Sequence, residues 1–207
     1  MTDLPPPAEC WKYIPSDKGD DVGDSIYLSV GKALSAWEMV EGAFAGIFSR
    51  FLFSESWAAE RAYGTIVGNR ARKEMLEAVA EIFFKFKKVS DEDQKSFRLI
   101  MEHFRQASAI RNNVAHGYVV SLTLSNKNMG VFLLPPHYNS KKTTSFVLRD
   151  HTVPREDISS AFGVSYSYTS RDIDGFAVKF RALNNLALEY QVKLISNYSP
   201  GVPKPTQ

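Results

Sequence analysis

Apolar residues recur at three- and four-residue spacing from Asp24 to His116, and this period constrains the fold more than any other feature of the chain. Such spacing places the apolar side chains on one face of an α-helix. The period is interrupted by turn and capping residues, so it predicts separate helices that pack together. We expect a bundle of four helices over residues 24–53, 57–67, 69–86 and 90–116.

Capping residues support the ends of these helices. Asp24 or Ser25, Asn69 and Ser90 can each accept hydrogen bonds from the first free backbone N–H groups of a helix. Gly117 stands where a left-handed C-terminal cap belongs. The fourth helix is therefore expected to stop at His116.

A different pattern follows Gly117. Residues 118–124 are β-branched and alternating, residues 126–128 resemble a turn, and residues 131–134 can return as a partner strand. These features predict an antiparallel hairpin. Weaker signals indicate strands over residues 145–148 and 163–168, and one helical turn over residues 154–161.

Asp172 can cap a last helix whose apolar residues return to the helical period. The fold class is therefore mainly α, an antiparallel helical bundle with a small antiparallel β-sheet elaboration. We expect a flexible leader over residues 1–23, the bundle over residues 24–116 and the β-rich elaboration over residues 117–171. A C-terminal helix over residues 172–197 is expected to pack on the bundle, and a tail follows over residues 198–207.

Composition excludes several classes of protein. A lone Cys10 leaves no internal disulfide and too few thiols for a structural zinc site. The first 15 residues carry acids and prolines where an export signal needs a basic start and an apolar run, and no segment is apolar enough to span a membrane. We therefore expect a cytoplasmic protein without a metal site or cofactor. A net charge of +2 neither supports nor excludes RNA binding.

Two charged residues interrupt the apolar faces of the predicted helices. Glu41 lies in the middle of the apolar stripe of the first helix, and Arg111 lies in the middle of that of the fourth. A single buried charge costs several kcal/mol unless an opposite charge offsets it. We predict that Glu41 pairs with Arg111, with Glu38 as the reserve partner. The alternative is that Arg111 extends to solvent and that Glu41 sits at an exposed end of its stripe.

The segment AIRNNVAHG, residues 109–117, resembles the motif of HEPN domains, a family of helical bundles named after higher eukaryotes, prokaryotes and nucleotide binding. That motif is an Arg followed by a polar residue, then a His after four to six residues, and here the gap is four. The resemblance covers roughly residues 24–116. It implies a metal-independent endoribonuclease whose site forms between two protomers, although other members of the family are inactive binding or scaffold modules.

The residue types fit that chemistry. His116 can transfer protons near neutral pH, and Arg111 can hold a phosphate through two parallel hydrogen bonds. Asn112, four residues from His116, can orient the imidazole. A second proton carrier is needed, and His103 points away from this face, so we expect a homodimer that brings two copies of His116 together. The alternative is that Asn112 and His116 only satisfy the last carbonyl groups of their helix.

Residues outside the motif carry weaker signals. Lys141 and Lys142 lie in a loop and can form a rim that contacts the RNA backbone, although a solvated loop is the simpler interpretation. Tyr166 and Tyr168 share one face of a strand and are assigned to the core. The expected function is an endoribonuclease that acts on single-stranded RNA. The alternative is a non-catalytic binding or scaffold protein that keeps Arg111, Asn112 and His116 for structural reasons.

Overall fold

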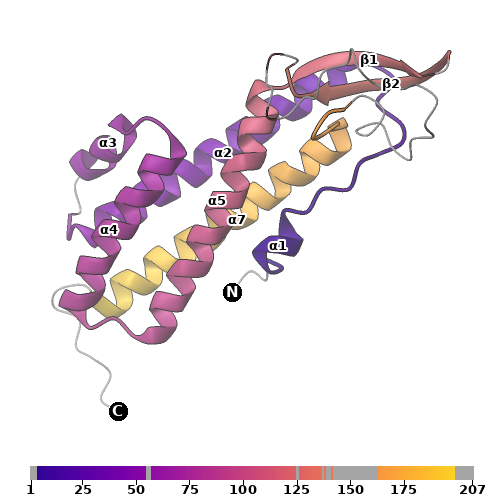
Figure 1. Ribbon diagram of the computed structural model, residues 1–207. Helices are drawn as coiled ribbons and strands as arrows, with labels where there is room; N and C mark the ends of the chain where they lie inside the picture. Colours follow the sequence, from indigo (N-terminus) through magenta and orange to yellow (C-terminus); the bar gives the residue numbers. More distant parts are fainter. Residues whose placement is uncertain are drawn as a thin grey trace. The chain divides into compact units, whose positions relative to one another are not determined.

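The computed structural model describes residues 4–54, 57–124, 126–136, 138, 141 and 163–198. The chain is mainly helical with a small two-stranded antiparallel sheet (Figure 1), which confirms the predicted fold class. Among the described helices, none is long and apolar enough to cross a bilayer. The strand expected over residues 145–148 and the helical turn expected over residues 154–161 lie outside the described residues.

The four helices predicted from the apolar period are present, and so is the last helix. Their bounds are Gly23–Phe51 for α2, Trp57–Thr65 for α3, Asn69–Lys87 for α4, Asp91–His116 for α5 and Ser170–Tyr198 for α7. A short helix that the sequence did not predict, α1, spans Pro7–Cys10. The period therefore located each long helix to within a few residues.

Of the predicted N-terminal caps, the one at Ser90 is present and the one at Asn69 is not. Ser90 caps α5 as expected, because its Oγ accepts a hydrogen bond from the Asp93 backbone N–H at 3.1 Å. Asn69 does not cap α4, since Gly68 takes the cap position and no side chain contributes a hydrogen bond there. An Asn placed one residue too late becomes the first helical residue instead.

The cap of α7 is reciprocal. Asp172 is the third residue of the helix, and its Oδ2 accepts hydrogen bonds at 2.8 Å from both the backbone N–H and the hydroxyl of Thr169. Thr169 Oγ1 in turn accepts from the Asp172 backbone N–H at 3.3 Å. The cap is therefore Thr169, with Asp172 as its partner in a capping box, and not Asp172 alone.

The prediction for Gly117 was wrong. Positive φ angles among the described glycines occur at Gly68, Gly130 and Gly163, so Gly117 is not a left-handed cap. Its small size is needed instead because β2, Lys127–Leu134, passes close by. A Cβ atom on Gly117 would lie 2.7 Å from Cγ of Leu133.

The chain divides into two compact units. Unit 1 contains residues 1–11, 37–108 and 179–207, and unit 2 contains residues 12–36 and 109–178. The long helices α2, α5 and α7 each supply residues to both units. This division cuts across the expected bundle of residues 24–116, because unit 2 groups the start of α2 and the end of α5 with the hairpin.

Aromatic rings form the core of unit 1. Phe104 of α5 has no exposed surface, and its ring centroid lies 4.2 Å from that of Phe44 and 5.4 Å from that of Trp37, both on α2. Trp37 also meets Phe180 of α7 at 5.4 Å. Tilted and edge-to-face contacts of this kind add to the stability gained by burial, so these rings hold three helices together.

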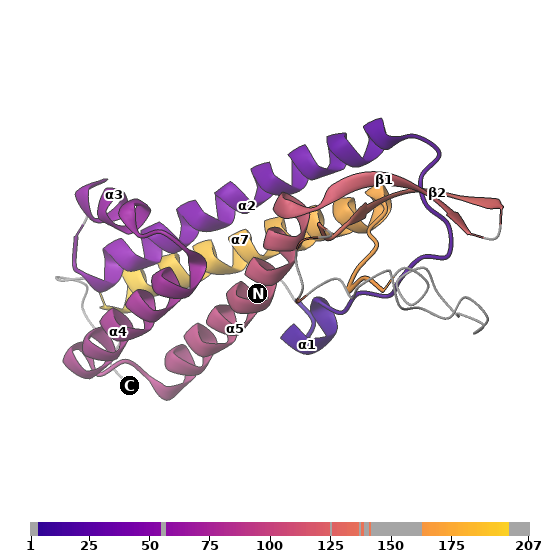
Figure 2. The ribbon, with the colours of Figure 1, turned by 45° about the horizontal axis from the view of Figure 1, so that its top comes forward.

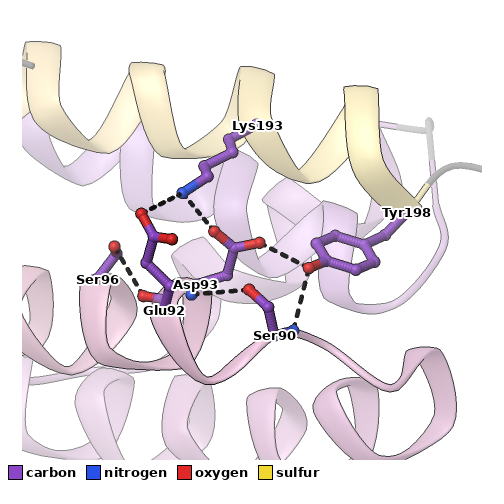
Figure 3. Close-up of polar contacts among 6 residues, drawn as sticks. All are labelled: Ser90, Glu92, Asp93, Ser96, Lys193 and Tyr198. Atoms are coloured by element: carbon purple, nitrogen blue, oxygen red, sulfur yellow. Dashed lines mark hydrogen bonds and ion pairs between the residues drawn. The ribbon is translucent and has the colours of Figure 1, made fainter. Parts of the chain in front are cut away.

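A polar cluster joins the start of α5 to the end of α7 within unit 1 (Figure 3). Asp93 is buried, and it forms an ion pair with Lys193 and accepts a hydrogen bond from the Tyr198 hydroxyl at 2.6 Å. Burial opposes ionisation of Asp93, but the hydrogen bonds from Lys193, Tyr198 and Ser90 outweigh it and lower the pKa of the carboxyl. The ion pair and the hydrogen bond therefore join the start of α5 to the end of α7.

Unit 2 contains the predicted hairpin. β1, Tyr118–Leu124, pairs antiparallel with β2, and a bulge lies between Leu122 and Thr123. The strand expected over residues 163–168 does not form, and Tyr168 makes only an isolated bridge with Leu133 of β2. The small core beneath the sheet consists of Leu122, Phe132, Leu134 and Val164.

The leader, residues 1–23, was expected to be flexible, and this prediction is wrong from residue 6 onward. In unit 2, the Gly19 N–H donates to the Met129 carbonyl at 2.8 Å, and Asp20 forms a bridge with Val131. In unit 1, α1 ends at Cys10, and both Cys10 and the following Trp11 are buried. Prolines gave the leader a disordered composition, but its apolar and backbone groups find partners far along the chain.

Trp11 is held by a buried histidine. Its indole Nε1 donates a hydrogen bond to His103 Nδ1 at 3.1 Å, and only 1% of His103 is exposed. Burial lowers the pKa of the imidazole, although the Glu102 carboxylate opposes the shift. The acceptor role of Nδ1 also requires a neutral ring.

We expect His103 to make the folded state sensitive to acid. Because its folded pKa lies below the ordinary value of 6.5, the unfolded chain binds the proton first as pH falls below that value, and the free energy of unfolding decreases. Urea unfolding at pH 7.5 and pH 5 should show a smaller acid loss for His103→Gln, whose amide oxygen can still accept from Trp11. His116→Gln is the matched control and should keep the wild-type loss. Equal losses in both variants would contradict this assignment.

Candidate functional site

The last two turns of α5 carry the three predicted site residues, and an adjacent asparagine anchors them. Asn113 Nδ2 donates a hydrogen bond to the Tyr168 hydroxyl at 3.0 Å, and the Tyr166 hydroxyl donates to the Asn113 carbonyl at 3.0 Å. The two tyrosine rings stack at 4.6 Å and are buried, as the sequence predicted for them. These contacts fix the rotation of the end of α5 within unit 2.

The tyrosines stay protonated at any physiological pH. Burial, followed by the influence of Tyr168, raises the pKa of Tyr166. Burial raises the pKa of Tyr168 to about 12, although the hydrogen bond from Asn113 opposes the shift. Tyr13 packs edge-on against Tyr168 at 4.7 Å and donates to the Ser167 carbonyl. Three neutral phenols therefore form a rigid support beneath the motif.

Arg111 is half-buried, as its place in the apolar stripe predicts. Its Nη1 donates a hydrogen bond to Asn112 Oδ1 at 3.2 Å, and its Nε is buried without a hydrogen-bond partner. No carboxylate among the described residues forms an ion pair with Arg111. The guanidinium is therefore not neutralised by the part of unit 2 that the structure describes.

His116 is exposed at the C-terminus of α5. Within the described ranges its imidazole makes no hydrogen bond and no ion pair, so the ring is open to an external partner. The expected contact from Asn112 to His116 is not made, because the Asn112 side-chain oxygen accepts from Arg111 instead.

The structure corrects the predicted ion pair. Glu41 is buried on α2, but its partner is Arg72 of α4, whose Nη1 lies 2.8 Å from Glu41 Oε2. The Tyr63 hydroxyl donates to the same oxygen at 3.2 Å. The reserve residue Glu38 is exposed. The prediction failed because Arg72 stands among other charged residues near the start of α4 and gave no sign of facing inward.

Arg72 is itself fixed by further contacts. Its Nε donates to the Ile66 carbonyl at 3.0 Å, and its guanidinium carbon lies 5.3 Å from the centroid of the Tyr63 ring. Burial, followed by the Glu41 carboxylate, raises the pKa of Tyr63, which therefore remains a donor. Glu41 Oε1 is buried without a hydrogen bond. This cluster of Glu41, Tyr63 and Arg72 explains Glu41 structurally, within unit 1.

The two predicted loop cations are Lys141 and Lys142. Lys141 is exposed, and Lys142 lies outside the described residues. Tyr138, four-fifths exposed, is near them in the sequence. Their role in contacting RNA stays a prediction.

Comparisons with known proteins add no relative. No protein-family model, no curated protein and no solved structure matches this chain. Among the described side chains, no group of three His, Cys, Asp or Glu residues could hold a metal ion. The motif geometry therefore carries the functional argument.

The sequence located Arg111, Asn112 and His116 on the correct turns but missed the support beneath them. Asn113 was passed over because its partners, Tyr166 and Tyr168, lie more than fifty positions along the chain. The available signal was the pair of tyrosines on one strand face, whose hydroxyl groups need partners when they are buried.

The cluster around Glu41 gives a test of stability. We expect Arg72→Met to lower the free energy of unfolding by about 3 kcal/mol, because it leaves a buried carboxylate without its cation. Adding Glu41→Gln should recover part of that loss, which urea unfolding of both single variants and the double variant can measure. Arg70→Met, which removes an exposed cation paired with Glu74 on the same helix, is the control and should have little effect. Equal losses for Arg72→Met and Arg70→Met would contradict the buried pair.

Proposed function

We propose that the chain is a metal-independent endoribonuclease that cleaves single-stranded RNA at a site containing Arg111, Asn112 and His116. The observation that carries this proposal is the combination of an open imidazole and a guanidinium that pairs with no carboxylate among the described residues, both on the last two turns of α5. The resemblance of residues 109–117 to the HEPN motif supports the same assignment.

The reaction that these groups can perform needs no external cofactor. A base removes the proton of a 2′-hydroxyl, the 2′-oxygen attacks the adjacent phosphorus, and the bond to the 5′-oxygen breaks as an acid protonates that leaving group. The products are a 2′,3′-cyclic phosphate and a 5′-hydroxyl. Imidazole is suited to both proton transfers, and the guanidinium is suited to the charge that builds on the phosphate oxygens.

Helix geometry argues that one protomer is not enough. At 100° per residue, Arg111 and His116 point about 140° apart around α5 and are separated by about 7.5 Å along its axis. One helix therefore presents them to different sides. A second copy of the helix can supply the missing group and also the second imidazole, so we propose that the active form is a homodimer with a composite site.

A non-catalytic binding or scaffold role is the second candidate. It is favoured by the hydrogen bond from Arg111 to Asn112, which occupies the side-chain oxygen that the enzymatic reading assigned to His116. In that case the two residues stabilise the end of α5, and His116 has no chemical task. Cleavage assays separate the two functions.

We expect purified protein to cleave a labelled single-stranded RNA in the presence of a chelator and to leave the matching DNA intact, because DNA lacks the 2′-hydroxyl. His116→Ala should lower the rate by roughly 10²–10⁴-fold, the usual contribution of a general acid or base. Arg111→Ala should also lower it strongly, whereas Arg105→Ala, which removes an exposed arginine from the same helix, should not. Activity unchanged in both motif variants would eliminate these residues. A wild-type protein without any cleavage would support the scaffold candidate.

Assembly gives an independent test of the composite site. We expect light scattering to show a homodimer at micromolar concentration, with an interface of more than about 1,000 Å² in total, as a lasting dimer requires. The two His116 rings should lie within about 15 Å of each other to share one phosphodiester, which distances between spin labels placed at position 116 can measure. Two copies of α5 can approach closely at the small residue Ala115, whereas Gly117 is already packed against Leu133. A protein that cleaves RNA at full rate as a monomer would rule out the composite site.

A further inference from the structure

An open groove lies between α4 and α5 in unit 1, and no residue of the motif lines it. Figure 2 shows these two helices side by side, and the groove between them encloses about 520 Å³. Its lining includes the buried apolar residues Ala80, Phe97 and Met101, together with the partly buried Phe84. We call these four residues the groove floor.

Charged side chains line both edges of the groove, and they pair along each helix rather than across it. The pairs lie at 2.6–2.7 Å and are Lys73 with Glu77, Lys85 with Glu81, and Arg105 with Glu102. No ion pair among the described residues joins α4 to α5 across the groove. Lys73 of α4 attracts the Glu102 carboxylate of α5 electrostatically, but no direct ion pair between described residues closes the groove over its apolar floor.

Arg98 differs from the other cations at these edges. It is exposed on α5 and lines the groove, but no carboxylate among the described residues pairs with it. Glu102, one turn further along, is already engaged by Arg105 and Gln106, whose hydrogen bonds lower its pKa to about 2. An occupant that carries an acidic group would therefore find one available cation beside an apolar surface.

The chemistry of the edges selects the class of occupant. The edges of the groove carry four cations and three carboxylates, so they lack the concentrated basic face that binding of a nucleic acid needs. The α4 edge runs from Lys73 to Lys85, a length of about 18 Å at the rise of an α-helix, which matches about three turns of a second helix. Mixed charges flanking an apolar strip are what the polar border of an amphipathic helix can pair with.

We propose that the groove between α4 and α5 binds an amphipathic helix of a partner protein, with its apolar face on the groove floor and an acidic side chain on Arg98. The apolar residues of that helix recur at i, i+3, i+4 and i+7. The surface pairs that line the groove are weak and exposed, so they can exchange partners when the helix arrives. This proposal does not rest on RNA cleavage.

The test uses the full chain and a synthetic helical peptide of about 15 residues, the length of a groove-binding helix. The peptide carries leucines at i, i+3, i+4 and i+7, with glutamates on the border of that face. A second peptide has lysines in place of those glutamates, and a third has the same composition with the leucines scattered around the helix. Fluorescence anisotropy gives the affinities, and methyl NMR of Met101 reports occupancy of the groove, with Met39 and Met129 as internal references.

We expect the acidic peptide to bind and to shift the Met101 methyl signal, and the lysine peptide to bind at least about tenfold more weakly. Arg98→Glu should reverse that preference. Lys95→Glu changes an exposed residue of α5 outside the groove and should leave the preference for the acidic peptide unchanged. Thermal unfolding of both variants checks that they are folded. Equal binding of the scattered peptide, or an unchanged preference in Arg98→Glu, would overturn the proposal. A Met101 shift caused by oligouridylate would also overturn the proposal, because it would identify a nucleic acid as the occupant. Self-association that Arg98→Glu abolishes would overturn it too, because it would identify a second copy of the chain as the occupant.

Discussion

The packing of Phe104 against Trp37 and Phe44 is the contact on which unit 1 depends. Phe104 is fully buried on α5, both partners lie on α2, and Trp37 reaches Phe180 on α7. Large rings at one level fix the rotation of each helix about its axis, because turning any of them would expose a ring. The rotation of each helix determines which of its other side chains point into the core and which point to solvent. On α5 it puts Met101 inward and Arg98 outward, and on α2 it turns Glu41 into the core.

Glu41 and Arg111 show two solutions to a charge in an apolar stripe. The short side chain of Glu41 cannot reach water from the core, so unit 1 surrounds it with Arg72 and Tyr63. Arg111 has a long stem and is half-buried, and its guanidinium donates a hydrogen bond to Asn112. A buried Nε without a hydrogen bond costs about 1–3 kcal/mol. Such a cost at the end of α5 fits a residue retained for something other than stability.

The sequence predicted the helices and the hairpin, which depend on local residue patterns. It did not predict the contacts between residues that lie far apart in the chain. Helical period located α2, α4, α5 and α7, and alternation located the hairpin, because burial of one face imposes a period directly. Arg72 as the partner of Glu41, Tyr168 as the support of Asn113, and His103 as the acceptor for Trp11 each join residues more than 30 positions apart. No local pattern announces such pairs. Prolines gave the leader the composition of a disordered segment, yet backbone pairing with β2 orders it.

The contacts of Asn113 with Tyr166 and Tyr168 also restrict the orientation of the motif residues at the end of α5. Asn113 is held from both its side chain and its carbonyl, so the last turn of α5 cannot rotate to bring Arg111 and His116 onto one side without breaking two part-buried hydrogen bonds. Each buried bond left unmade costs about 1–3 kcal/mol, and a rotation of about 140° would break the helix as well. A rigid helix end that points its guanidinium one way and its imidazole another is unsuited to single-chain catalysis. It is suited to meeting a second copy, since a twofold axis restores through symmetry the proximity that one helix denies.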